Sequence, residues 1–263
     1  MSFFSPPFVD EGLGNQDAGI SPQLGSLLPN VVEYTGAGTY TFTAVVTGWH
    51  FLRICAGGGC GGRRDNGTDR NATGGGGGES AYEWVFLFAG EQIEIVLGAG
   101  GAIPGADSNG NPGGQSTATG PRGLSIIVNG GLGGLTSAAG FAAAAIDGGA
   151  GGTGGSGGDK HVDGQDGAGR GVSTIFSVSC GGVCALVTTP DPPPTNQTDA
   201  YGLFQDFYSL IDVIPPFTSS RDFLSGSGTY NGTYTAPSPG CGSAGMMFTQ
   251  GTPGGDGWAV VLY

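Results

Sequence analysis

The sequence predicts an all-β fold in which a small antiparallel β-sandwich is joined to a sandwich of glycine-rich polyglycine-II helices, with one short amphipathic helix in an insertion. Two observations lead to this prediction. Glycine is dense in segment 57–171, which includes five consecutive glycines at 74–78. The segments on either side of it alternate apolar and polar residues with a period of two, which is typical of half-buried β-strands.

The composition indicates that these glycines are ordered. Of the 263 residues, 58 are glycine and 16 are proline, a proportion that is common in low-complexity chains. However, only 11% of the residues are charged and 38% are hydrophobic, which is the reverse of the composition of disordered chains. We therefore expect the glycine-rich region to fold.

The polyglycine-II conformation explains how a glycine-rich region folds. It has three residues per turn and no internal hydrogen bonds, so each peptide group needs a partner on a neighbouring segment. Segments such as 130–134 and 148–152 carry almost no side chains, so they can approach one another closely. We expect φ near −75° and ψ near +145° to dominate 130–134 and 148–155.

Residues 1–29 are expected to form an extended attachment arm, because Pro6, Pro7 and Pro22 interrupt regular structure. The apolar residues of the arm are too far apart to form a core of their own, so we expect them to anchor it on a partner. These anchors are Phe3, Phe4, Phe8, Leu13, Ile20, Leu24, Leu27 and Leu28.

The sandwich strands are expected within 30–187 and are completed by strands in 226–263. Gly36-Ala37-Gly38 marks the turn between 31–34 and 39–43, and Ala89-Gly90-Glu91 is expected to join 81–88 and 92–97 as a tight hairpin. Aromatic and β-branched side chains concentrate in the strands and are expected to supply the core. The predicted strands are 31–34, 39–43, 50–55, 81–88, 92–97, 124–128, 174–178, 183–187, 229–235 and 258–263.

Residues 188–225 interrupt this pattern. A proline-rich linker precedes 201–213, where apolar residues recur at helical spacing between a candidate N-cap, Asp199, and a stop at Pro215. The sequence predicts a short amphipathic helix here, whose apolar face packs on the sandwich or on a neighbouring subunit.

Charge and cysteine content limit the possible partners. The formal net charge is −13 with a single lysine, so direct nucleic-acid binding is not expected. No apolar run reaches the length of a membrane span and the N-terminus lacks the features of a signal peptide, so we expect no membrane insertion and assembly in a cytoplasm. Reduced, buried thiols are favoured for the five cysteines, with a Cys55/Cys60 or Cys180/Cys184 bridge left open.

Motifs for catalysis or metal binding have simpler explanations. Gly154 to Gly158 matches the nucleophile-elbow pattern, but no strand-to-helix context surrounds it and such matches are expected by chance in this composition. The acidic loops 107–111 and 159–166 contain oxygen ligands suited to Ca²⁺, yet solvated turn residues are favoured. We predict no enzyme, no cofactor and no metal site; paired carboxylates for glycan cleavage remain a minor alternative.

Several segments resemble a known family. They are YTGAGTYTF at 34–42, ICAGGG at 54–59, the five glycines that precede SAY at 80–82, GEQIEIVLGAGG at 90–101 and GGDGWAVVLY at 254–263. Together they are similar to the glycine-rich domain of bacteriophage tail fibres and related virion proteins. The resemblance covers about residues 31–171 and 226–263.

This resemblance implies a β-rich base and a sandwich of polyglycine-II helices whose tips, here 63–71, 103–112, 135–146 and 159–166, present loops to a host surface. It implies a structural virion protein, with a tail fibre or tail-tip adhesin favoured and a head-decoration or cement protein as the alternative. The implied partners are other virion proteins through the arm, a host surface glycan or outer-membrane protein, and further copies of the chain, as a trimer. The candidate receptor-binding residues are Arg63, Arg64, Asp65, Arg70, Asp107, Asn109, Asp159, Lys160, His161 and Asp163.

Overall fold

The structure, a computed structural model, describes residues 30–65, 71–137, 146–169, 177–178, 181–182, 237, 239–243, 245–247 and 252–263. The predicted arm with its eight anchors, the strands at 183–187 and 229–235, the insertion with its helix, and Arg70 lie outside the described residues.

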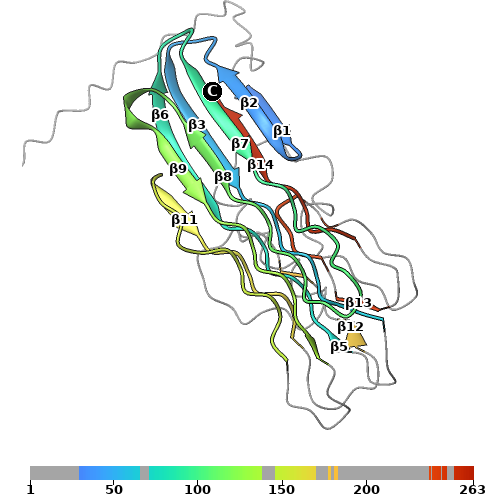
Figure 1. The fold of residues 1–263 in the computed structure, drawn as a ribbon. Helices are drawn as coiled ribbons and strands as arrows, with labels where there is room; N and C mark the ends of the chain where they lie inside the picture. The colour runs from blue at the N-terminus through green and yellow to red at the C-terminus, as the bar shows by residue number, and fades with distance from the viewer. Residues whose placement is uncertain are drawn as a thin grey trace, which may run out of the picture.

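Two antiparallel sheets form the sandwich at one end of an elongated molecule (Figure 1). The first sheet has the order β1-β14-β3-β6-β11, with β1 (Val31–Thr35), β14 (Trp258–Leu262), β3 (Gly48–Cys55), β6 (Ser80–Leu87) and β11 (Lys160–Val162). The second has the order β2-β7-β8-β9, with β2 (Gly38–Thr43), β7 (Gln92–Leu97), β8 (Ser116–Thr119) and β9 (Ser125–Val128). The all-β prediction is confirmed, and among the described residues the helical content is one turn of 3-10 helix, Pro121–Gly123. The hairpin expected at 89–91 is wrong, because β6 and β7 lie in different sheets and do not pair.

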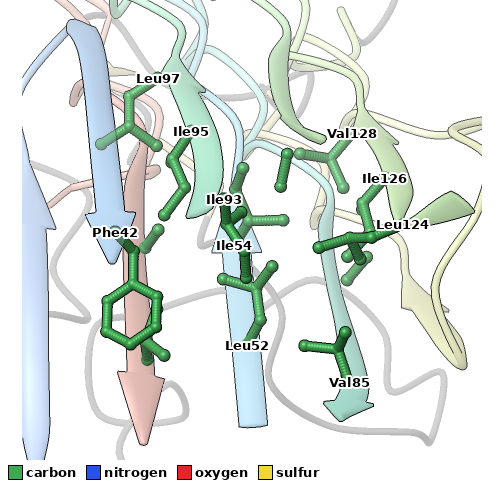
Figure 2. Packing of buried hydrophobic residues seen from close by; sticks show 14 of the residues in the cluster. Phe42, Leu52, Ile54, Val85, Ile93, Ile95, Leu97, Leu124, Ile126 and Val128 are labelled. Carbon is green, nitrogen blue, oxygen red and sulfur yellow. The ribbon is translucent and has the colours of Figure 1, made fainter. Parts of the chain in front are cut away.

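The core lies between these two sheets and follows the period of two along each strand. Leu52 and Ile54 of β3 point inward from the first sheet and meet Ile93 and Ile95 of β7, all four being fully buried (Figure 2). Burial of each such side chain contributes about 1.5–3 kcal/mol. The core is mainly aliphatic.

The prediction that aromatic side chains of the strands supply the core is wrong for β6. Val85 and Leu87 of β6 face the second sheet, so Tyr82, Trp84 and Phe86, which alternate with them, face away from it. The smaller aliphatic residues fill the space between the sheets, and the rings cover the outer face of the first sheet.

The glycine segments run from the ends of the strands toward the other end of the molecule (Figure 1). Segment 73–79 lies inside this bundle. Its successive amide groups donate hydrogen bonds to three neighbouring segments in turn, with N···O distances of 2.8–3.3 Å. Thr73, Gly76 and Glu79 donate to segment 129–135, Gly74 and Gly77 donate to 165–168, and Gly75 and Gly78 donate to 240–243. Each neighbour is therefore met every third residue, the repeat of polyglycine II.

The carbonyl oxygens of segment 73–79 show the same repeat on the acceptor side. They accept hydrogen bonds from segment 56–62 at Thr73, Gly76 and Glu79, from segment 149–152 at Gly74 and Gly77, and from Gly182 at Gly75. The segment thus has six hydrogen-bonded neighbours, and the prediction of packed polyglycine-II segments is confirmed. Gly154 departs from the expected angles, with φ of 78°, at the point where the chain turns toward the sandwich.

The close packing explains the need for glycine inside the bundle. A Cβ atom added to Gly76 would lie 2.0 Å from the carbonyl oxygen of Ala150, and one added to Gly131 would lie 2.1 Å from that of Gly76. Both contacts are with backbone atoms, which cannot rotate away. Larger residues within the glycine runs point outward, as Leu132 does with 54% exposure.

Two small sheets lie within the bundle, toward the end far from the sandwich (Figure 1). In one, β4 (Arg63–Arg64) pairs in parallel with β13 (Met246–Met247). In the other, β5 (Asn71–Ala72) lies between β10 (Thr136–Ser137) and β12 (Ser177–Val178). Residues 177–178 of the predicted strand therefore belong to this small sheet and not to the sandwich.

The cysteines are not all reduced. Cys55 is disulfide-bonded to a residue outside the described part of the chain, which corrects the expectation of reduced thiols at this position. Cys60 and Cys241 are buried and form no disulfide, so the Cys55/Cys60 bridge is excluded. Burial raises the pKa of the Cys60 thiol, which favours its neutral form.

Candidate functional site

Four of the predicted receptor-binding residues meet at the end of the bundle that is far from the sandwich, which we call the distal tip. Arg63 donates to both carboxylate oxygens of Asp65, from Nε at 3.1 Å and from Nη2 at 2.6 Å. Nη1 of Arg64 lies 3.4 Å from Oδ1 of Asp107. The side chains of these four residues are only 17–24% exposed, so the ion pairs help to hold the loops together.

Backbone contacts fix the loop that carries Asp107 against β4. Arg63 and Ser108 exchange two backbone hydrogen bonds of 2.9 and 3.0 Å, and the amide of Asp65 donates to Oδ1 of Asp107 at 2.9 Å. Asp107 adopts the left-handed region with φ of 54°, which aspartate tolerates better than most residues. The hydrogen bond to Asp65 raises the pKa of Arg63, so this guanidinium stays charged.

Asn109 joins a third loop to the distal tip. Its side-chain oxygen accepts hydrogen bonds from the amide and the hydroxyl of Thr136, at 2.9 and 3.1 Å. Ile103 and Leu135, from the same loops, are 46% and 39% exposed. The described part of the tip therefore presents paired charges beside exposed aliphatic groups.

The second predicted charge cluster lies elsewhere. Asp159, Lys160, His161 and Asp163 were expected in a fourth tip loop, but Lys160–Val162 form β11 and pair with β6 at the edge of the first sheet. Oδ2 of Asp159 accepts a hydrogen bond of 2.9 Å from the amide of Trp84. The structure therefore separates this cluster from Arg63 and Asp107.

Sequence reasoning missed a buried carboxylate at the junction of the sandwich and the glycine bundle. Glu79 is 1% exposed, and Oε2 accepts hydrogen bonds from the amides of Asn129 at 3.0 Å and Gly155 at 2.9 Å. Nδ1 of His161 lies 2.6 Å from Oε1 of Glu79, and Nε2 of His161 contacts the carbonyl oxygen of Gly157. A useful signal was present, since Glu79 is the one charged residue between the five glycines and the apolar start of β6.

The sequence places Tyr82, Trp84, Phe86 and Phe88 on one face of a strand, but it did not predict that these rings lie on the outer face of the first sheet. Phe51 and Trp84 are cross-strand partners with ring centres 5.1 Å apart, and Trp49 meets Phe86 edge to face at 5.6 Å. Beside them, the guanidinium of Arg53 lies 5.1 Å from the ring centre of Trp258, and burial lowers the pKa of Arg53 to about 9. The outer face is therefore largely apolar.

Within the described ranges, no three His, Cys, Asp or Glu side chains converge in a way that could hold a metal ion. The same part of the chain contains no helix that is long and apolar enough to span a membrane.

Comparison with known proteins identifies the family. No curated protein matches the chain. The model of a family described as a glycine-rich domain matches residues 34–263, which include the polyglycine-II bundle and both sheets of the sandwich except for residues 31–33 of β1. The chain therefore belongs to this glycine-rich domain family.

Proposed function

We propose that the protein is a non-enzymatic structural component of a tailed-phage virion, a tail fibre or tail-tip adhesin whose distal tip binds the host cell surface. One observation carries the proposal: the hydrogen-bonded polyglycine-II bundle holds loops from distant parts of the sequence together, away from the sandwich (Figure 1). Binding residues are often found on loops that a rigid scaffold positions.

The proposal assigns different roles to the two ends of the molecule. Residues 1–29 attach the protein to other virion proteins, and the chain acts as a homo-oligomer. The distal tip contacts a glycan or an outer-membrane protein of the host. The net charge of −13 disfavours nucleic acid as the ligand.

The contacts at the distal tip indicate which side chains are suited to a ligand. Both carboxylate oxygens of Asp65 already accept hydrogen bonds from Arg63, so replacing Arg63 would disturb the loop itself. Arg64 has the longer ion-pair contact, 3.4 Å to Asp107, and is better able to exchange it for an anionic group of a glycan. Ile103, 46% exposed, provides an apolar contact beside it.

Adsorption of particles to host cells tests this role. Particles that carry Arg64→Ser together with Ile103→Ser are expected to adsorb at least about tenfold more slowly, the effect of losing about 1.4 kcal/mol of binding free energy. The matched control is Lys160→Ser, which removes a cation from the cluster on β11 and is expected to leave adsorption unchanged.

The virion assignment and the adhesin role can be tested separately. Immunoblotting of purified particles locates the protein first, and its absence there would overturn the virion assignment. Unchanged adsorption of the Arg64 and Ile103 variant, with normal amounts of protein in the particle, would overturn only the adhesin role. A copy number that follows the capsid subunits would then identify a head-decoration protein.

A further inference from the structure

The outer face of the first sheet carries an aromatic strip that the distal tip does not explain. We define the strip as Trp49, Phe51, Tyr82, Trp84, Phe86 and Phe88. Trp49, Trp84 and Phe88 are 63%, 54% and 54% exposed, although large apolar side chains are usually buried. The strip lies on the sandwich, and the distal tip lies at the other end of the molecule (Figure 1).

The rings of the strip form two groups of three that lie side by side on one face of the sheet, because Trp84 and Phe86 are two residues apart on β6. Phe51 contacts both Tyr82 and Trp84, and Phe86 contacts both Trp49 and Phe88, with ring centres 5.1–5.6 Å apart. The exposed valines of the loop after β2, Val45 and Val46, lie near one end of the strip, because Thr47 of that loop accepts a hydrogen bond from Ala89.

The size and composition of the strip fit the centre of a protein interface. An aromatic side chain offers about 150–250 Å² of surface, so the three most exposed rings alone present roughly 300 Å². A stable interface needs about 800 Å² from each partner, with an aromatic centre that is poor in charge and a polar rim. The strip contains no charged residue, and its rim includes the ion pair between Arg122 and Glu91.

The edge of β6 beside the strip excludes one mode of association. Asp159 accepts a hydrogen bond from the amide of Trp84, Arg122 donates to the carbonyl oxygen of Phe86 at 2.7 Å, and Glu91 accepts from the amide of Phe88 at 2.7 Å. Because side chains already occupy these backbone groups, a partner cannot extend the sheet by adding a strand here. A partner must therefore pack face to face on the rings.

We propose that the aromatic strip is the contact between two copies of this chain. A two-fold contact requires a surface that is complementary to itself, and a uniform apolar strip satisfies this requirement. The rim carries charges of both signs, such as Arg122 and Glu91, so a second copy can bring opposite charges together. Because each chain has a net charge of −13, two copies repel each other least when they meet at a surface without charged side chains. Face-to-face packing of the sandwiches also leaves both distal tips accessible. The proposal does not depend on a virion role.

Sedimentation equilibrium of the full-length protein tests the contact. The wild-type chain is expected to associate within a range of about 1–100 μM, typical of modest interfaces. Trp49→Ser combined with Trp84→Ser is expected to raise the dissociation constant at least about tenfold. The matched control is Leu132→Ser combined with Leu135→Ser, which removes two exposed apolar side chains from the glycine bundle and is expected to leave association unchanged.

Circular dichroism melting curves verify that both double variants fold, since all four positions are exposed. If the double tryptophan variant fails to fold, Phe88→Ser replaces it, because Phe88 follows β6 and is 54% exposed. A wild-type chain that remains monomeric at 100 μM would overturn the proposal and leave a different protein or a glycan as the occupant of the strip. Equal association of the wild-type and strip variants would also overturn it.

Discussion

At the scale of single residues, Glu79 connects the sandwich to the glycine bundle. Its carboxylate accepts hydrogen bonds from two glycine-bundle segments, at Asn129 and Gly155, and pairs with His161 of β11. Since the group is 1% exposed, water cannot replace these partners when the carboxylate is removed. The amides of Asn129 and Gly155 would then lose an acceptor in a site that excludes solvent.

Replacement of Glu79 is therefore expected to be costly. Glu79→Ala should lower the free energy of unfolding by about 2–6 kcal/mol, because two buried amide donors would each lose an acceptor at a cost of about 1–3 kcal/mol. Glu79→Gln should cost less, because its amide oxygen can still accept one hydrogen bond. The measurement is urea denaturation, with the exposed Glu94→Gln of β7 as the control. Equal midpoints for Glu79→Ala and the control would show that Glu79 does not hold the junction.

At the scale of elements, the turn after β6 protects the edge of the first sheet. Arg122 donates a hydrogen bond of 2.7 Å to Glu91, and its guanidinium carbon lies 4.8 Å from the ring centre of Phe88. The carboxylate of Glu91 also accepts a hydrogen bond from the backbone amide of Phe88. The hydrogen bond from Arg122, and then that from Phe88, lower the pKa of Glu91 from its ordinary value of 4.5. The deprotonated form is thus favoured in the folded protein.

The pH dependence of stability follows from this shift. A carboxyl group whose pKa is lower in the folded state stabilises the fold above its unfolded pKa and loses this contribution as the pH falls through its folded pKa. The difference in stability between the wild-type chain and Glu91→Gln should be constant near neutral pH and should shrink below about pH 4.5. Urea denaturation at several pH values measures this difference in stability. The difference between the wild-type chain and Arg122→Gln should shrink in the same pH range. A difference that grows in acid would contradict the assignment.

The elements also show what the sequence could predict. Strands such as β2 and β7 were found because one face is apolar and the other is mainly polar. β8 (Ser116–Thr119) and β11 (Lys160–Val162) were missed because three or four small or polar residues give no periodic signal. The two faces of β6 are both apolar, so alternation alone could not decide that Val85 faces the core and Trp84 faces outward.

The same limit applies to the candidate site. The grouping of Arg63 to Asp65 with Asp107 could be anticipated, because both segments were expected in tip loops by resemblance. The separation of Lys160 and His161 from them depends on the pairing of β11 with β6. In the bundle, many glycine segments are chemically equivalent, so sequence indicates that they pack but does not indicate which segment donates to which.

At the scale of the whole molecule, the sandwich and the bundle share their chain segments. The chain passes directly from β3 into segment 56–62, and segment 73–79 leads directly into β6. Each sheet therefore ends in segments that the bundle holds in place by backbone hydrogen bonds. We expect damage inside the bundle to destabilise the sandwich as well.

A single methyl group tests this coupling. In Gly76→Ala the new Cβ would lie 2.0 Å from the carbonyl oxygen of Ala150, so the central segment must move and its hydrogen bonds to six neighbours must weaken. Overpacking in a tight core usually costs about 1–3 kcal/mol, and we expect at least about 3 kcal/mol because backbone atoms cannot repack. The control is Gly48→Ala at the start of β3, where no atom lies within 4 Å of the new Cβ.

Tryptophan fluorescence reports on the sandwich, since Trp49, Trp84 and Trp258 all belong to the first sheet. It should reveal a lower melting temperature for Gly76→Ala and an unchanged one for Gly48→Ala. If fluorescence melts at the wild-type temperature in Gly76→Ala, the sandwich is stable without an intact bundle, and the two parts of the molecule fold independently.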